Sequence, residues 1–271
     1  MKKRIAAFLL AAGLVLSLGA CGAKKEETAE KKVVVGASPA PHCAILEVAK
    51  ELMAKDGYTL EIKEFNDYVI PNDAVEQGEL DANYFQHVTY MNNFNTEHGT
   101  HLVNVAGIHY EPFGLYAGKT ASLDALADGA KIAVPNDASN EARALLLLQQ
   151  EGLITLKEGV GLDATKYDIA ENPHNYEIVE IQADLLPNTL QDVDMAVING
   201  NYAIDAGLKV SDAVAVEAAD GAAAEAYVNI LAVKEGHEKD EGILALVKAL
   251  QSAEVKAFIE KTYEGAVVAL F

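Results

Sequence analysis

Along the chain, stretches with the hydrophobic pattern of β-strands alternate with stretches that have the hydrophobic pattern of helices. Apolar runs such as residues 33–36 and alternating stretches such as residues 58–65 are typical of β-strands. Apolar residues spaced at helical intervals, as over residues 45–53, indicate amphipathic helices. The expected strands are residues 33–36, 58–65, 102–108, 131–134, 177–181, 195–198 and 227–233, with a strand-to-loop passage over 80–85. The expected helices are residues 45–53, 73–77, 88–94, 140–150, 183–190, 201–206, 243–250 and 253–262.

Strands that alternate with helices favour an α/β fold, in which mostly parallel sheets are covered by helices on both faces. The pattern forms two such blocks, and the chain crosses between them near residues 116–123 and again near residues 216–228. We therefore expect two lobes, each a mixed, mostly parallel sheet flanked by helices, with a ligand in the cleft between them. The first lobe is expected to comprise residues 33–118 and 226–271, and the second lobe residues 119–225.

The first twenty residues have the three parts of an export signal. Three basic residues precede a short apolar run over residues 6–18, and small residues come directly before Cys21. The cations keep the N-terminus on the cytoplasmic side, the apolar run partitions into the bilayer, and small side chains give a peptidase access to the bond. The run is too short to span a bilayer comfortably. We expect residues 1–20 to be removed and Cys21 to become a lipid-modified N-terminus outside the cytoplasm.

The charge of the chain limits its partners. Removing residues 1–20 removes three cations and no acid, which changes the formal net charge from −20 to −23. Such a field repels nucleic acid and anionic lipid, so acyl chains rather than a basic patch must hold the protein at the membrane. Residues 21–32 are mostly charged and are expected to form a disordered tether. With Cys21 acylated, Cys43 has no partner for a disulfide and is expected to be a small buried residue.

Polar and aromatic residues gather where the predicted strands end. Ligands of open α/β sheets bind at the carboxyl ends of the strands, where loops enter helices. Four such segments stand out, at residues 38–42, 83–87, 135–143 and 199–202. The third contains Arg143, the only arginine that remains once the signal is removed.

Arg143 is the sharpest candidate for a binding residue. It lies near the start of a predicted helix, where free backbone N–H groups favour an anion, and its planar fork suits a carboxylate better than lysine does. Asn199 and Asn201 are placed to hold an ammonium group or the remaining carboxylate lone pairs. An apolar pocket is expected to be lined by Tyr68, Phe85, His87 and Tyr90. This combination indicates a site for a zwitterionic amino acid, although core packing explains each aromatic residue alone equally well.

Two other classes of function stay open. A metal site would draw on the scattered histidines and the free cysteine, which are His42, His87, His98, His101, His109 and Cys43. No pair of these residues has tight ligand spacing, so a metal-binding lipoprotein is the weaker alternative. A hydrolase is weaker still, because no nucleophile elbow, P-loop or dinucleotide fingerprint is present, although triads also assemble from distant positions.

Six segments resemble the methionine-binding lipoproteins, the NlpA/MetQ-like substrate-binding components of methionine ABC importers. The matching segments, in order, are residues 36–42, 78–87, 111–116, 135–145, 196–203 and 265–268. The family resemblance implies a two-lobed periplasmic-binding-protein fold of type II and a monomeric, lipid-anchored protein that is not an enzyme and needs no cofactor. It implies methionine as the ligand, and a membrane permease with its ATPase as partners.

The same resemblance implies roles for individual residues. Arg143 would bind the ligand carboxylate, and Asn199 and Asn229 would hold the amino and carboxylate groups. The thioether slot would be lined by Tyr68, Phe85, His87 and Tyr90. The sequence departs from the family pattern at Ala138, Ala142 and Cys43, which leaves the ligand preference within the family open.

Overall fold

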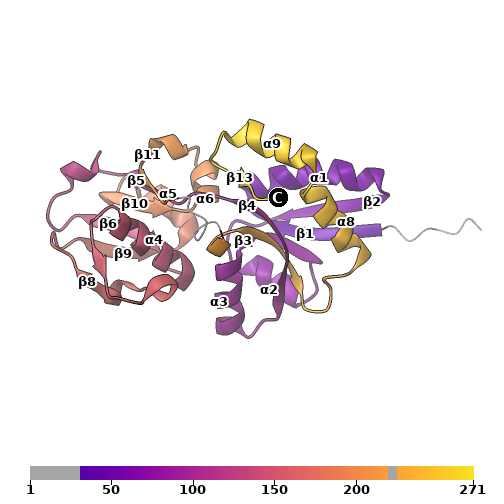
Figure 1. The fold of residues 1–271 in the computed structure, drawn as a ribbon, viewed down its shortest axis with the longest axis horizontal. Coiled ribbons are helices and arrows are strands. Elements are labelled where there is room, and N and C mark those ends of the chain that lie inside the picture. The colour runs from indigo at the N-terminus through magenta and orange to yellow at the C-terminus, as the bar shows by residue number, and fades with distance from the viewer. Residues whose placement is uncertain (1–30, 219–224) are drawn as a thin grey trace, which may run out of the picture.

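The computed structural model describes residues 31–218 and 225–271, so the expected export signal and Cys21 lie outside the described residues. The described chain forms two lobes, each built around its own sheet (Figure 1). The strands of the first sheet come from both ends of the chain, and those of the second come from its middle. The α/β class and the two-lobed arrangement expected from the sequence are confirmed.

The first lobe has a mixed six-stranded sheet with the order β13-β4-β12-β3-β1-β2. Its strands are β1 (Lys31–Ala37), β2 (Tyr58–Glu64), β3 (Ala82–His87), β4 (Leu102–Tyr110), β12 (Asn229–Lys234) and β13 (Val268–Ala269). Its helices are α1 (Ala44–Lys55), α2 (Ile70–Glu76), α3 (Val88–His98), α8 (Glu241–Leu250) and α9 (Ala253–Tyr263), with a π-turn at Pro39–Cys43. Strand β1 is parallel to β2 and β3, whereas β12 runs antiparallel to β3 and β4.

The second lobe has a five-stranded sheet with the order β11-β5-β10-β6-β9. Its strands are β5 (Gly114–Ala117), β6 (Lys131–Pro135), β9 (Glu177–Ile181), β10 (Met195–Ile198) and β11 (Ala213–Val216), and a separate hairpin pairs β7 (Thr155–Leu156) with β8 (Ile169–Glu171). Its helices are α4 (Ala138–Gln150), α5 (Leu186–Thr189) and α6 (Gly200–Asp205). The expected lobe boundaries stay a prediction, but β5 pairs in this sheet although it falls in the range expected for the first lobe.

Buried side chains alternate between the two faces of each sheet, as the strand period requires. Along β12, Leu231 and Val233 pack with α1, α8 and α9, whereas Ile230 and Ala232 pack with α2 and α3 on the other face. Both faces of β10 are covered as well, by clusters that include α4 on one side and α6 on the other. These strands therefore appear in the sequence as continuous apolar runs.

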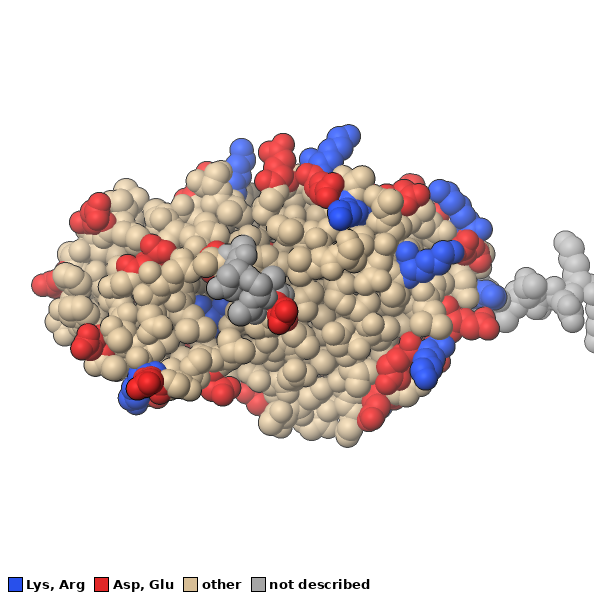
Figure 2. Space-filling model, viewed as in Figure 1, with Lys and Arg blue, Asp and Glu red and all other residues tan. Residues whose placement is uncertain are grey.

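The surface carries the charge that the composition predicts. On the face shown in Figure 2, acidic and basic side chains lie mainly around the outline of both lobes, and the middle of that face is largely uncharged. Within the described residues, no helix combines the length and the apolar character needed to cross a bilayer.

Candidate functional site

A cavity lies between the two lobes, at the ends of β3, β6 and β10. Its lining comprises Tyr68, Phe85, Gln86, His87, Tyr90, Glu111, Asn140, Arg143, Asn199, Gly200, Asn201 and Asn229. All eight residues that the sequence analysis named as ligand contacts are in this lining. The structure thus brings the candidate residues together from both lobes, while their individual roles stay predictions.

Helix α4 carries Arg143 into the cavity, and Asp137 caps the start of this helix. The Asp137 carboxylate accepts hydrogen bonds from the backbone N–H of Asn140 at 3.0 Å and from the Asn140 side chain at 2.9 Å. A helix N-terminus favours an anion, and here the protein's own carboxylate supplies it. The ligand carboxylate was predicted at this position, so the structure leaves Arg143 as the remaining anchor for it on α4.

The Arg143 guanidinium is already bound by Glu217, a residue that the sequence analysis missed. Its Nε donates to Glu217 Oε2 at 2.9 Å, and its Nη2 donates to Glu217 Oε1 and, at 2.8 Å, to the backbone carbonyl oxygen of Glu111. Burial alone would lower the pKa of Arg143, but the Glu217 charge raises it above its ordinary value. The side of the guanidinium formed by Nε and Nη2 is therefore occupied by protein groups. None of the hydrogen bonds among the described residues uses the two N–H groups of Nη1, which are available to a ligand.

This ion pair lies where the chain crosses between the lobes. Glu217 follows β11, and it also accepts hydrogen bonds from the Tyr110 hydroxyl and from the backbone N–H of Phe113 at 2.9 Å. Tyr110 ends β4 in the first sheet, and Phe113 directly precedes β5 in the second. The rings of Phe113 and Tyr227 lie 4.5 and 4.2 Å from the guanidinium, within range of a cation–π interaction. Arg143 is thus fixed to the crossing segments of the fold.

His87 joins the two lobes across the cavity as a neutral imidazole. Its Nδ1 accepts a hydrogen bond from the backbone N–H of Tyr90 at 3.0 Å, so the ring proton must be on Nε2. That nitrogen donates to Asn140 Oδ1 at 3.1 Å, and the same oxygen accepts from Asn199 Nδ2 at 2.9 Å. Burial, together with the nearby Arg143 charge, lowers the pKa of His87 to about 3. The site therefore holds this residue uncharged at neutral pH.

This arrangement predicts a loss of stability in acid that depends on His87. Because the folded pKa, about 3, is below the usual value of 6.5, the unfolded chain takes up a proton first as the pH falls through 6.5. At pH 5, this group should lower the free energy of unfolding by about 2 kcal/mol relative to pH 8. Urea unfolding of the wild type and of His87→Gln at both pH values measures the difference.

In this experiment, His87→Gln should lose less stability between pH 8 and pH 5 than the wild type does, because glutamine does not titrate. The exposed His237 provides the matched control, since His237→Gln should follow the wild-type curve. Equal pH dependence of the wild type and His87→Gln would contradict the prediction.

Glu111 lines the cavity and lies beside two buried histidines. Its Oε1 accepts a hydrogen bond from His109 Nε2 at 2.7 Å and lies 3.5 Å from His42 Nε2. Burial lowers the pKa of His109 to about 3, and burial lowers the pKa of His42 to about 4, although the nearby Glu111 charge acts in the opposite direction. Tyr84 contacts His109 Nδ1, and His42 Nε2 donates to Asn229 Oδ1 at 2.9 Å. The network therefore connects Glu111 to a predicted ligand contact.

The structure separates most of the residues considered for a metal site. His42 and His109 come together, and with Glu111 their ligand atoms lie within 4.8 Å of one another, but His109 is already hydrogen-bonded to Glu111 and His42 to Asn229. His98 is stacked on Phe94, with ring centroids 4.0 Å apart, and His101 pairs with Glu76. His87 bonds to Asn140, and Cys43 Sγ lies 3.8 Å from the carbonyl oxygen of Ala37.

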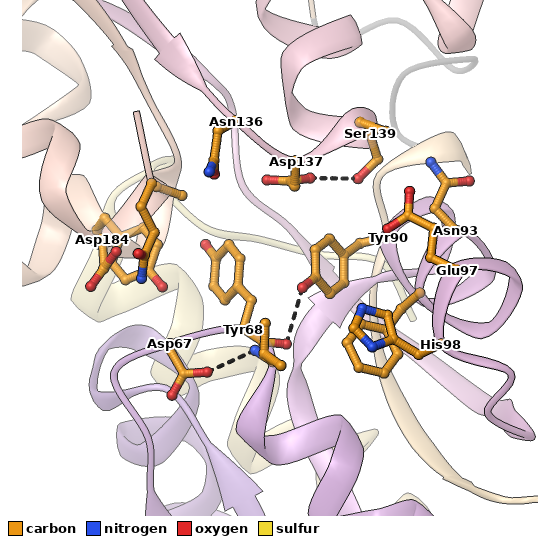
Figure 3. A pocket seen from close by; sticks show the side chains of 16 residues that line it. Asp67, Tyr68, Tyr90, Asn93, Glu97, His98, Asn136, Asp137, Ser139 and Asp184 are labelled. Atoms are coloured by element: carbon orange, nitrogen blue, oxygen red, sulfur yellow. Dashed lines mark hydrogen bonds between the residues drawn. The ribbon is translucent and has the colours of Figure 1, made fainter. Parts of the chain in front are cut away.

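Tyr68 lines two cavities. One is the cavity described above, called the inner cavity from here on, and the other is a larger neighbour, called the outer cavity. The outer cavity has a volume of about 480 Å³ and is also lined by residues of both lobes. Figure 3 shows the rings of Tyr68 and Tyr90 in its wall, and the Tyr90 hydroxyl donates to the backbone carbonyl oxygen of Tyr68 at 3.1 Å. Tyr68 donates its own hydroxyl proton to Asn201 Oδ1 at 2.6 Å, across to the second lobe. The two cavities therefore adjoin at Tyr68 and Tyr90, which line both.

The residues of the site that were not predicted as contacts are Gln86, Glu111, Asn140 and Gly200 in the cavity lining, and Glu217, the partner of Arg143. Asn140 follows the capping residue Asp137 by three positions, so the capping pattern was a signal for it. Glu111 falls within a segment that matched the family, and nothing local distinguishes Glu217 from the many other acidic residues of the chain.

Comparison with known proteins gives the family. A family model described as NlpA lipoprotein matches residues 33–271 of the chain. The chain belongs to the NlpA lipoprotein family. The resemblance found in the six sequence segments is thereby confirmed.

Named relatives and solved structures match over nearly the whole chain. The D-methionine-binding lipoprotein MetQ of Escherichia coli is 40% identical over 266 residues, which cover 96% of each chain. A nutrient-binding protein of Burkholderia cenocepacia, solved bound to methionine, is 44% identical with a TM-score of 0.84, covering 88% of this chain and all of that chain. A lipoprotein structure from Ruminococcus gnavus is 58% identical with a TM-score of 0.88, covering 89% and 100%.

Proposed function

We propose that this protein binds methionine in the cavity between its lobes and delivers it to an ABC importer. The observation that carries the proposal is the inner cavity, whose lining contains all eight residues expected to contact the ligand. The names of the Escherichia coli and Burkholderia cenocepacia relatives support methionine as the ligand. In this proposal Cys21 carries the lipid anchor on the extracytoplasmic face, a permease and its ATPase are the partners, and the protein works as a monomer.

The geometry supports a division of the cavity into a charged end and an apolar end. The two N–H groups of Arg143 Nη1 point to the ligand carboxylate as their partner, since Nε and Nη2 are used by Glu217 and the Glu111 backbone. Tyr68, Phe85 and Tyr90 form a connected set of rings with centroids 5.6 to 6.2 Å apart, a suitable wall for a thioether chain. The ligand would thus bind to both lobes at once and favour their closure.

Binding, rather than catalysis, is the role that this arrangement supports. Two titratable side chains of the cavity lining are already engaged by protein groups, since His87 donates to Asn140 and Arg143 pairs with Glu217, which lies outside the lining. A catalytic nucleophile would need a base within hydrogen-bonding reach, and neither pair has this form.

Titration calorimetry of the full chain in detergent tests the proposal. We expect L-methionine or D-methionine to bind with a dissociation constant in the nanomolar to micromolar range, and to raise the melting temperature. Alanine is the control ligand, because it has the same charged groups but no thioether chain. If neither methionine enantiomer gives heat or a shift in melting temperature, the proposed ligand is wrong.

A further inference from the structure

Tyr202 contacts the opposite lobe although it does not line the inner cavity. It lies on α6 in the second lobe, is 7% exposed, and is part of the lining of the outer cavity. Its hydroxyl donates a hydrogen bond to the backbone carbonyl oxygen of Asn66, in the first lobe, at 2.9 Å. Its ring stacks on that of Tyr68, also in the first lobe, with centroids 4.9 Å apart. Tyr202 therefore acts on the interface between the lobes and not on the inner cavity itself.

Tyr68 makes the reciprocal contact. Its hydroxyl donates to Asn201 Oδ1, in the residue next to Tyr202, at 2.6 Å. Each tyrosine thus donates across the interface to the segment that carries the other. Tyr68 also packs against a hydrophobic cluster of the first lobe and against the cluster of the second lobe that contains Tyr202. The two hydrogen bonds and the ring stack all join protein groups, so none of them requires a ligand.

The environment of the two hydroxyls keeps both of them as donors. Burial raises the pKa of Tyr202 and of Tyr68 above its ordinary value, so both stay protonated at physiological pH. The acceptor of Tyr202 is a carbonyl oxygen, which has no proton to give, so the direction of that bond is fixed. A hydrogen bond or an aromatic pair of this kind changes an equilibrium by about 2- to 12-fold. Separation of the lobes would break all three contacts at once.

We propose that Tyr68 and Tyr202 form a clasp between the lobes, and that Tyr202 is a positioning residue of the site. It holds Tyr68 against the second lobe and slows the departure of a bound ligand, but it does not select the ligand. This inference rests on the proposed function and deepens it, because it concerns release from the same cavity. The two tyrosines differ in this respect, since Tyr68 also lines the inner cavity.

The first test measures how fast radiolabelled L-methionine leaves the full chain in detergent after unlabelled methionine is added in excess. Tyr202→Phe keeps the ring and removes the hydrogen bond to Asn66, so release should be about 2- to 12-fold faster. Tyr202→Leu also removes the ring stack, and release should be roughly 10- to 100-fold faster. A wild-type release rate in the folded Tyr202→Phe variant would overturn the proposal, whether or not Tyr202→Leu folds.

Tyr116 gives the matched control for a buried tyrosine of the second lobe. It belongs to the same hydrophobic cluster as Tyr202, and its strand β5 pairs with β10 and β11 in the second sheet. Tyr116→Phe should release methionine at the wild-type rate. Equally fast release from Tyr116→Phe and Tyr202→Phe would show a general loosening of the cluster and would overturn the clasp.

A comparison with norleucine tests whether Tyr202 selects the ligand. Norleucine has a methylene group in place of the sulfur atom, so it reports on the fit of the side chain. The ratio of the methionine and norleucine affinities in Tyr202→Phe should stay within about twofold of the wild-type ratio. A ratio that changes as much as the methionine affinity does would mean that Tyr202 shapes the side-chain slot, which contradicts a positioning role.

A measurement without ligand separates this inference from the proposed function. Hydrogen exchange followed by mass spectrometry reports on residues 66–73 in the first lobe and 199–206 in the second, whose helical N–H groups are hydrogen-bonded. Tyr202→Phe should speed exchange in both segments, because each loses a partner in the other lobe. Faster exchange confined to residues 199–206 would indicate a local defect of α6 and overturn the clasp. If the wild type binds no methionine, the proposed function fails, and the exchange result alone decides the inference.

Discussion

Replacing Arg143 with alanine is expected to weaken methionine binding and to destabilise the fold at the same time. The change removes the Nη1 groups proposed for the ligand carboxylate, which should cost about 2–4 kcal/mol of binding free energy. It also leaves Glu217, whose side chain is 8% exposed, without its cation. Breaking such a buried pair costs about 3–5 kcal/mol of folding free energy. Titration calorimetry and urea unfolding of one preparation measure both effects.

A double variant separates the two effects of Arg143. Arg143→Met combined with Glu217→Gln removes both charges, so no unpaired charge remains in the interior. Its free energy of unfolding should return to within about 2 kcal/mol of the wild type, whereas methionine binding should stay lost because the methionine side chain donates no hydrogen bond. Recovery of binding in the double variant, or wild-type affinity in Arg143→Ala, would show that Arg143 does not bind the ligand carboxylate.

The expected strands over residues 177–181 and 195–198 have the bounds of β9 and β10. Residues 195–198 coincide with β10, because a strand covered by helices on both sides is a continuous apolar run. Strands β5 and β11 were not predicted, since each lies beside a segment where the chain was expected to cross between the two blocks. Strand β5 is defined by its pairing with β10, and β11 by its pairing with β5, and both pairings form only in the folded chain. The expected helix over 183–190 is a 3₁₀ turn followed by α5.

The candidate site was predicted well where its residues follow strands, and poorly where its charges meet across the fold. Asn199 comes directly after β10 and His87 ends β3, so the strand-end rule was sufficient for both. Glu217, the partner of Arg143, is 74 residues away along the sequence, and it comes close only because the chain crosses between the lobes there. Glu111 is similar, because its surroundings come from His42 and His109, in separate segments. No local pattern contains such pairings.

Tyr68→Ala is expected to lower the affinity for methionine by roughly 30- to 1,000-fold, which corresponds to about 2–4 kcal/mol for loss of a central aromatic contact. Tyr68 belongs to the first lobe and contacts the second at two points. Its ring stacks on Tyr202 with centroids 4.9 Å apart, and its hydroxyl donates to Asn201 Oδ1 at 2.6 Å. The alanine therefore removes part of the wall of the cavity and part of the contact that holds the lobes together. Calorimetry with methionine measures the loss.

Two variants show which part of Tyr68 is responsible. Tyr68→Phe keeps the ring and removes only the hydrogen bond to Asn201, so it should cost about 0.5–1.5 kcal/mol, much less than the alanine. Tyr167 is the matched control, since it is 78% exposed and lies in the second lobe away from the cavity lining, and Tyr167→Ala should bind like the wild type. Equal losses in Tyr68→Phe and Tyr68→Ala would mean that the hydroxyl, not the ring, carries the contact. Wild-type affinity in Tyr68→Ala would show that the ligand binds without this wall.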